Sequence, residues 1–371
     1  MKILCEKSEL VNCISIVSRA VSSNKTSMSI LGCILIEASN GVIRLTANDR
    51  ELGIETKVKG EIKDNGVVAI DANIFGSVIR SLPDGQVSIS TDSSNKTTIK
   101  CQKSKFDLPG KSGEDFSALP VIEKDKMITI SQYTLKEVIR QTIFAVSVKD
   151  NNKLLTGELF DIKGDKMKVV ALDGHRVAIR NIELRQSYED RKVIIPGKTL
   201  NEIGRILSGE IEKEVNIYFM PNHIVFEFDQ TVIVSRLLEG EFFDVDKMLG
   251  NSGNFSLTIK VNKKAMQETV ERATLLTKDD DKKPVVINVK DDSMEFIIKS
   301  TIGSMNEFLD IDKKGEDMLI GFNPKFLLDV LRVTDDEELS IYILNSKAPA
   351  FIKDDGDKYN YVILPINFNT V

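Results

Sequence analysis

Few side chains of this sequence have the types and spacing that catalysis requires. The chain has 371 residues but only 2 histidines, His175 and His223, and it contains no HExxH, GxSxG or phosphate-loop motif. His175 follows Asp173 and Gly174, which leaves three interpretations open: a general base of a hydrolase, a turn between two strands, or the wall of a surface pocket. We expect a protein that is not an enzyme, with no catalytic residues, no metal and no cofactor.

Basic residues at helical positions are more informative. Arg80, Arg205 and Arg332 are separated by 125 and 127 residues, and each lies near the end of a helix-like segment. Six such segments carry twelve Lys or Arg and seven Asp or Glu, a net charge of +5 in a chain whose net charge is −6. If the helices share one face, that face attracts nucleic-acid phosphates without reading bases. The alternative is that each cation balances a helix dipole or a nearby glutamate. The segments are residues 7–20, 71–82, 132–145, 197–208, 262–275 and 323–333.

The elements that hold these residues occur in the same order three times. In each third, a helix-like segment is followed by strand-like runs, a second helix-like segment and further strands. In the first third, Leu10, Ile14 and Val17 follow the spacing of a helix with one buried stripe, and Asn40-Gly41 is typical of a tight hairpin. We predict an α+β fold of three repeated βαβββ-duplicated domains, with helices on one face of the sheets. Their predicted bounds are residues 1–125, 126–250 and 251–371.

Composition indicates where the protein works. The 4 cysteines, Cys5, Cys13, Cys33 and Cys101, all lie in the first third without a histidine nearby. This pattern favours buried free thiols over a disulfide framework or a zinc site. Acidic residues interrupt the start of the chain, and no apolar run approaches the ~18 residues of a membrane span. We expect a cytoplasmic protein with no membrane partner.

Four segments together carry a resemblance to a known family. They are LTANDRELGIE in the first third, ALDGHRVAI in the second, and NPKFLLDVL and YVILPIN in the third. In these motifs and their order, the sequence resembles the bacterial DNA sliding clamps, the beta subunit of DNA polymerase III, over essentially its whole length. The resemblance implies a processivity factor in which two crescent protomers close head to tail into a ring around double-stranded DNA. Each protomer would form half of the ring, with helices lining the inside and sheets on the outside. Implied partners are DNA polymerase subunits, the clamp loader and repair proteins that carry linear peptide motifs.

The resemblance assigns three groups of residues. Contact with DNA is implied for Lys25, Arg80, Lys149 and Lys198, to which the charge pattern adds Arg205 and Arg332. The dimer interface would use Lys103, Lys105, Phe106 and Leu108 on one edge strand, and Leu275, Leu276 and Glu307 on the opposing edge. A pocket for partner peptides would be formed by Leu155, Leu172, Gly174, His175, Arg176, Val177, Phe243, Lys247, Met248, Asn323, Phe326, Val362, Ile363, Leu364, Pro365 and Ile366.

Alternatives remain for each assignment. Phe243 stands where the family commonly has proline, Leu172 where threonine is common and Asn367 where a basic residue is frequent, so the peptide preference stays open. The predicted DNA-contact residues are equally typical of solvated surface charges. Phe106 and Leu275 could instead belong to the cores of their domains. Two other functions also fit parts of the sequence: a three-repeat protein scaffold that does not encircle DNA, and a hydrolase centred on His175 and Asp173.

Overall fold

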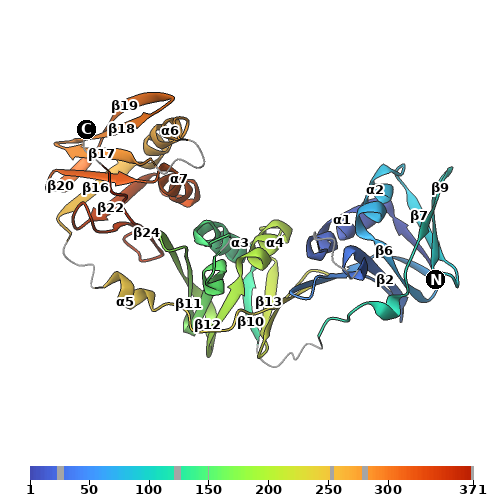
Figure 1. Cartoon of the computed structure of the whole chain (residues 1–371). Helices are drawn as coiled ribbons and strands as arrows, with labels where there is room; N and C mark the ends of the chain where they lie inside the picture. Colours follow the sequence, from blue (N-terminus) through green and yellow to red (C-terminus); the bar gives the residue numbers. More distant parts are fainter. Residues whose placement is uncertain (23–28, 121–126, 149, 251–254, 278–282, 369–371) are drawn as a thin grey trace. The chain divides into compact units, whose positions relative to one another are not determined.

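The computed structural model describes residues 1–22, 29–120, 127–148, 150–250, 255–277 and 283–368. The chain forms two compact units, Met1–Leu135 with Glu202–Leu237, and Lys136–Asn201 with Leu238–Val371. Helices and strands are mixed throughout both units, which confirms the α+β class (Figure 1). Each unit combines parts of two predicted thirds, so the division at residues 125 and 250 stays a prediction.

The six predicted helical segments all form helices. Asp71, Asn262 and Asn323 precede three of them, and each side chain accepts a backbone N–H of the first turn, which satisfies a donor that the helix itself cannot pair. One further short helix, α5 (Val245–Leu249), was not predicted. The predicted segments correspond to α1 (Lys7–Val17), α2 (Ala72–Ser81), α3 (Gln132–Thr142), α4 (Gly197–Ile206), α6 (Lys263–Thr274) and α7 (Pro324–Val333).

The first unit contains two antiparallel sheets. Helices α1 and α2 pack against each other (Figure 1), and their buried side chains include Leu10, Ile14, Phe75 and Ile79. The five-stranded sheet has the order β5 (Gly60–Asp64), β1 (Lys2–Glu6), β7 (Gln86–Thr91), β8 (Lys96–Cys101) and β9 (Ser104–Pro109). The eight-stranded sheet has the order β10 (Met127–Ser131), β13 (Glu214–Phe219), β14 (His223–Phe228), β15 (Thr231–Arg236), β4 (Leu52–Val58), β3 (Val42–Asn48), β2 (Cys33–Ser39) and β6 (Gly66–Asp71).

The second unit also contains two sheets, and α6 packs against α7 (Figure 1). The seven-stranded sheet has the order β11 (Gly157–Leu172), β12 (Arg176–Pro196), β24 (Tyr359–Ile363), β23 (Ala350–Lys353), β22 (Glu338–Ile343), β16 (Leu257–Asn262) and β20 (Asp312–Gly315). The four-stranded sheet has the order β19 (Gly303–Asp310), β18 (Ser293–Ser300), β17 (Val285–Lys290) and β21 (Met318–Phe322).

Edge-strand pairing joins the predicted thirds of the chain. Strand β4 of the first third pairs antiparallel with β15 of the second, and the hydroxyl oxygens of Thr56 and Thr231 lie 2.9 Å apart across this joint. Strand β12 of the second third pairs in the same way with β24 of the third. Both joints continue a sheet from one third of the chain into the next, so the backbone groups of four edge strands are satisfied.

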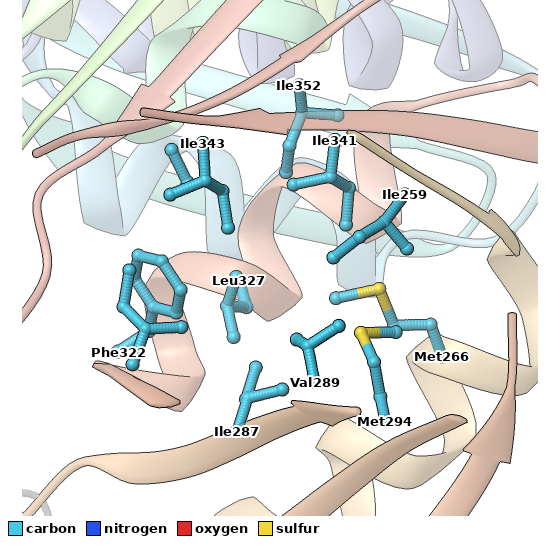
Figure 2. Close-up of a pocket in the computed structure, with 12 residues that line it drawn as sticks. Ile259, Met266, Ile287, Val289, Met294, Phe322, Leu327, Ile341, Ile343 and Ile352 are labelled. Atoms are coloured by element: carbon cyan, nitrogen blue, oxygen red, sulfur yellow. The ribbon is translucent and has the colours of Figure 1, made fainter. Parts of the chain in front are cut away.

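A small cavity lies in the core of the second unit between the helices and the sheets. Met266 of α6 and Leu327 of α7 line it together with Val289, Met294, Phe322 and isoleucines of several strands (Figure 2). Its volume is about 20 Å³, and its lining is entirely apolar. A water molecule would find no hydrogen-bond partner there, so we interpret the cavity as a packing defect of the core.

The four cysteines are buried, and none forms a disulfide bond with another. Burial raises the pKa of the Cys5 thiol to about 12 and that of Cys13 to about 11, which keeps both thiols protonated and unreactive. Among the described residues, no group of three His, Cys, Asp or Glu side chains is placed to hold a metal ion. The helices of the described chain are too short or too polar to cross a membrane.

Candidate functional sites

The predicted DNA-contact residues that the structure describes are all exposed. Arg80 lies in the last turn of α2, Lys198 and Arg205 lie on α4, and Arg332 lies in the last turn of α7. The side chains of Arg205 and Arg332 are each 57% exposed. Their ion pairs are long and solvated, 3.3 Å from Arg205 to Glu202 and 3.6 Å from Arg332 to Glu271. Such pairs are weak, so phosphate oxygens could replace the carboxylates. Lys25 and Lys149 lie outside the described residues.

Other helical arginines are engaged within the protein. Arg140 donates to Glu137 at 2.6 Å and to Asp335 at 2.8 Å, and its Nη1 also donates to a backbone carbonyl. Arg19 pairs with Glu202 at 2.7 Å. The excess of +5 counted along the helices therefore overstates the positive charge that is available to a partner.

The residues predicted for the peptide pocket all belong to the second unit. Leu155, Leu172, Val177 and Phe243 belong to one apolar cluster with Val245 of α5. Leu172 is only 3% exposed, and Val362 and Ile363 are likewise buried within β24. These three side chains are therefore buried in the structure, and their contact with a peptide stays a prediction.

Asp173, Gly174 and His175 form the turn between β11 and β12. Oδ1 of Asp173 accepts the backbone N–H groups of His175 at 3.0 Å and Arg176 at 3.1 Å. Gly174 has a φ of +84°, a conformation that glycine adopts without strain. The Asp173 carboxylate thus closes the turn, and the imidazole of His175 instead stacks on the ring of Phe326 at 6.0 Å. The turn interpretation is confirmed, and this geometry gives the hydrolase alternative no support.

Arg176 is the most enclosed charge of the site, with a side chain that is 10% exposed. Its Nε donates to Oδ2 of Asp173 at 3.0 Å, and its Nη1 donates to Oδ2 of Asp329 at 2.5 Å. Nη2 donates to the carbonyl oxygen of Phe144. The guanidinium carbon lies 4.4 Å from the centre of the Phe326 ring and 5.2 Å from that of Phe144, within cation–π range of both.

Helix α7 and the end of the chain complete the site. The Asn323 side chain caps α7 by accepting the N–H of Lys325 at 3.0 Å, which places Phe326 in the first turn. Leu364 follows β24, is 40% exposed, and donates its backbone N–H to the carbonyl oxygen of His175 at 2.9 Å. Pro365 and Ile366 continue this segment, and the N–H of Ile366 bonds the carbonyl oxygen of Gly321 at 2.8 Å.

Helix α5 contributes the remaining predicted residues. Met248 is 58% exposed, and Lys247 pairs with Asp244 at 3.1 Å. The Asp244 side chain also accepts the backbone N–H of Lys247, so this aspartate caps the helix. The sequence reasoning missed this helix because it is too short to show a periodic pattern, although an aspartate before VDKML is a capping signal.

The predicted interface residues lie on or next to β9, on β19 and at the end of α6. Lys103, Lys105 and Phe106 are on or next to β9, where Phe106 is 37% exposed and Leu108 is buried. Leu275, at the end of α6, is 76% exposed, so neither it nor Phe106 is a core residue. Leu276 is half-buried beside it. On β19, Glu307 accepts a bond from Arg272, and this bond holds the pKa of the carboxyl group below its ordinary value.

Three family models match successive parts of the chain. Models for the N-terminal, central and C-terminal domains of the DNA polymerase III beta subunit match residues 1–120, 129–244 and 253–367. The chain is 32% identical to the beta sliding clamp of Staphylococcus aureus over 355 residues, which cover 93% of each protein. It is similar to the crystal structure of a sliding clamp from Bacillus subtilis, with 30% identity, a TM-score of 0.95 and coverage of 100% of both chains. A structure from Eubacterium rectale described as a DNA polymerase III beta subunit has 54% identity, a TM-score of 0.96 and the same coverage.

Proposed function

This chain belongs to the family of bacterial DNA polymerase III beta subunits, the DNA sliding clamps, and from that premise we propose that two copies of it close head to tail into a ring around duplex DNA. Sliding clamps are non-catalytic processivity factors. We extend this to the present chain and infer that it acts without chemistry of its own, as a tether for polymerases, the clamp loader and repair proteins.

The observation that carries the ring is the way the sheets end. Within one chain, two joints are made by antiparallel pairing of edge strands, β4 with β15 and β12 with β24. Of the two remaining sheets, the five-stranded sheet has β5 and β9 at its edges, and the four-stranded sheet has β19 and β21. Pairing of β9 with β19 of a second copy would repeat the same type of joint and satisfy both edges. Exposed Phe106 lies on β9, and exposed Leu275 lies at the end of α6, which contacts β19. Both would then be covered by the partner.

The exposed cations support a sliding contact. Arg80, Lys198, Arg205 and Arg332 are exposed on helices, and the ion pairs of Arg205 and Arg332 are long and solvated. We propose that these four side chains face the phosphate backbone. Contacts of this kind are independent of sequence and exchange readily. A ring needs no stronger attachment, because the closed protein holds the DNA topologically.

We propose that the candidate peptide site receives the linear motifs of partner proteins. Met248, Leu364 and His175 are exposed, and His175 and Arg176 both contact the ring of Phe326. The same unit contains the apolar cluster around Leu172. Apolar anchors of a peptide would be buried there, and the few polar groups around them would orient it.

The ring is tested by retention on circular DNA. The chain is loaded onto a nicked circular plasmid with the clamp loader, and the DNA-bound fraction is isolated by gel filtration before and after cutting with a restriction enzyme. We expect retention on the circle and loss from the linear product. The double variant Lys105→Glu, Phe106→Glu places two carboxylates at exposed positions of the proposed joint, so it should sediment as a monomer and should not be retained.

Three outcomes would contradict the proposal. Equal retention of the wild-type chain on circular and linear DNA would indicate ordinary binding without encirclement. An unchanged sedimentation coefficient of the double variant would exclude β9 from the interface. A scaffold that does not encircle DNA would give no retention on either DNA form.

A further inference from the structure

Asp329 is not one of the residues expected to contact a peptide, yet it holds one of them in place. It lies on α7 three residues after Phe326, so the two side chains are neighbours on the helix surface. Its carboxylate accepts Nη1 of Arg176, and the two residues are 153 positions apart in the sequence. The contact joins α7 to the turn between β11 and β12.

The two carboxylates around Arg176 have different tasks. Asp173 lies in the same turn as Arg176, and its Oδ1 accepts two backbone N–H groups of that turn. It can orient the guanidinium group only relative to its own turn. Asp329 comes from α7, and its side chain is 33% exposed. Among the described residues, it provides the ion pair that ties Arg176 to the helix carrying Phe326.

Arg176 in turn orders a series of rings that leads from the core to the surface. Tyr361 is fully buried, and its ring centre lies 5.7 Å from that of Phe144. Arg176 contacts the rings of Phe144 and Phe326, and Phe326 stacks on exposed His175. The planar guanidinium group stacks on aromatic faces, and the ion pairs of Arg176 fix the orientation of that plane. The position of the outer rings therefore depends on the ion pairs of Arg176.

We propose that Asp329 is a positioning residue of the peptide site: through Arg176, it keeps Phe326 and His175 in the arrangement that a partner peptide binds. This inference rests on the proposed function of that site. Without Asp329, Arg176 keeps Asp173 and the carbonyl of Phe144, and only the ring contact remains between Arg176 and α7. A peptide would then have to order the surface when it binds, which lowers its affinity.

The experiment measures peptide affinity and the environment of His175 in the same variants. A fluorescein-labelled peptide with one glutamine and two leucine anchors is titrated with the full-length chain, and binding is followed by anisotropy. We expect Asp329→Ala to weaken binding about tenfold, and Asp329→Asn, which keeps the shape but not the charge, to weaken it less. The matched control is Glu271→Gln. It removes the α6 carboxylate that pairs with Arg332, which lies on α7 like Asp329, and this variant should bind the peptide like the wild-type chain.

Two further measurements separate positioning from general loss of structure. The chain has 2 histidines, so labelled histidine gives one imidazole signal for His175 and one for His223 as an internal reference. We expect Asp329→Ala to shift the His175 signal and to leave His223 unchanged. If Asp329 acts through Arg176, the double variant Arg176→Ala, Asp329→Ala should bind the peptide no more weakly than Arg176→Ala alone.

The outcomes distinguish this inference from the function on which it rests. If the wild-type chain binds the peptide and Asp329→Ala binds within twofold of it, the positioning role is overturned and the peptide site stands. The same conclusion follows if the two substitutions weaken binding additively. If the wild-type chain does not bind the peptide, the proposed site is overturned, and the inference with it.

Discussion

Arginines of this protein occupy two opposite environments. Arg176 is enclosed by two carboxylates, a backbone carbonyl and two aromatic rings, with a side chain that is 10% exposed. Arg205 and Arg332 extend from helix ends into solvent, each 57% exposed. An enclosed guanidinium group fixes the positions of the residues around it, whereas a solvated one acts on distant charges and rearranges at little cost. One residue type therefore serves tertiary structure at one site and, in our proposal, attraction of DNA at the other.

Glu158 is a third case, a buried acid that pairs with no Lys or Arg among the described residues. Glu158 of β11 is fully buried, and its Oε2 lies 2.9 Å from the hydroxyl oxygen of Thr142. That hydroxyl also lies 2.8 Å from the carbonyl oxygen of Val138, and it has one hydrogen to donate. Both contacts are satisfied if a protonated Glu158 donates to Thr142. Burial raises the pKa of Glu158 to about 8, which agrees with a neutral acid.

The largest effect is expected from Arg176→Ala. It removes three donated hydrogen bonds and leaves the carboxylates of Asp173 and Asp329 without their shared cation. The free energy of unfolding should fall by about 3 kcal/mol, as for other enclosed ion pairs that lose one partner. Urea denaturation measures this change, with Arg332→Ala as the control. Equal urea midpoints for Arg176→Ala and Arg332→Ala would mean that the enclosed arginine stabilises the fold no more than the solvated one.

A smaller, pH-dependent effect is expected from Glu158→Gln. Between the ordinary pKa of 4.5 and the raised value of about 8, the folded wild-type chain retains a proton that the unfolded chain has lost. Its free energy of unfolding should therefore fall as the pH rises through this range, by about 2 kcal/mol from about pH 6 to pH 7.5. Glutamine cannot ionise, so the variant should lack this contribution. Urea midpoints at the two pH values test the difference, and parallel pH profiles would contradict it.

The smallest effect on stability is expected from the solvated arginines. Replacing Arg80, Arg205 and Arg332 together by alanine should change the free energy of unfolding by no more than about 0.5 kcal/mol per site. DNA affinity should nevertheless fall. In a plot of the logarithm of the binding constant against the logarithm of the salt concentration, the magnitude of the slope should decrease by about 3, because three phosphate contacts are lost. The control replaces three exposed strand lysines, Lys96, Lys163 and Lys192, and should leave that slope unchanged. Equal slopes for both triple variants would remove the DNA role of the helical arginines.

Local features of the fold could be predicted from the sequence. The periodic stripe that includes Leu10 and Ile14 forms α1, and Asn40-Gly41 forms the turn between β2 and β3 with φ angles of 50° and 76°. Asp173-Gly174 likewise forms a turn. These predictions succeed because a helical turn or a hairpin is decided by residues within about four positions of one another.

The candidate sites could be predicted only in part. The motif that carries Phe326 also contains Asp329, but nothing in the motif indicates that this carboxylate reaches Arg176. The spacing of Arg80, Arg205 and Arg332 located basic helix ends, but it could not separate them from Arg140, which Glu137 and Asp335 engage. Burial of Leu172 was also missed, because the sequence gives the apolar character of a residue but not its depth.

By itself, the sequence determined the helices, the hairpins and the order in which they repeat, since each depends on neighbours along the chain. The tertiary structure decided which strand edges pair, which cations remain in solvent, and that Arg176 binds groups 32 and 153 residues away. The physical reason is that long-range partners are selected by burial of surface and by pairing of sheet edges. Both depend on the packing of the whole unit, and no local pattern of residues specifies them.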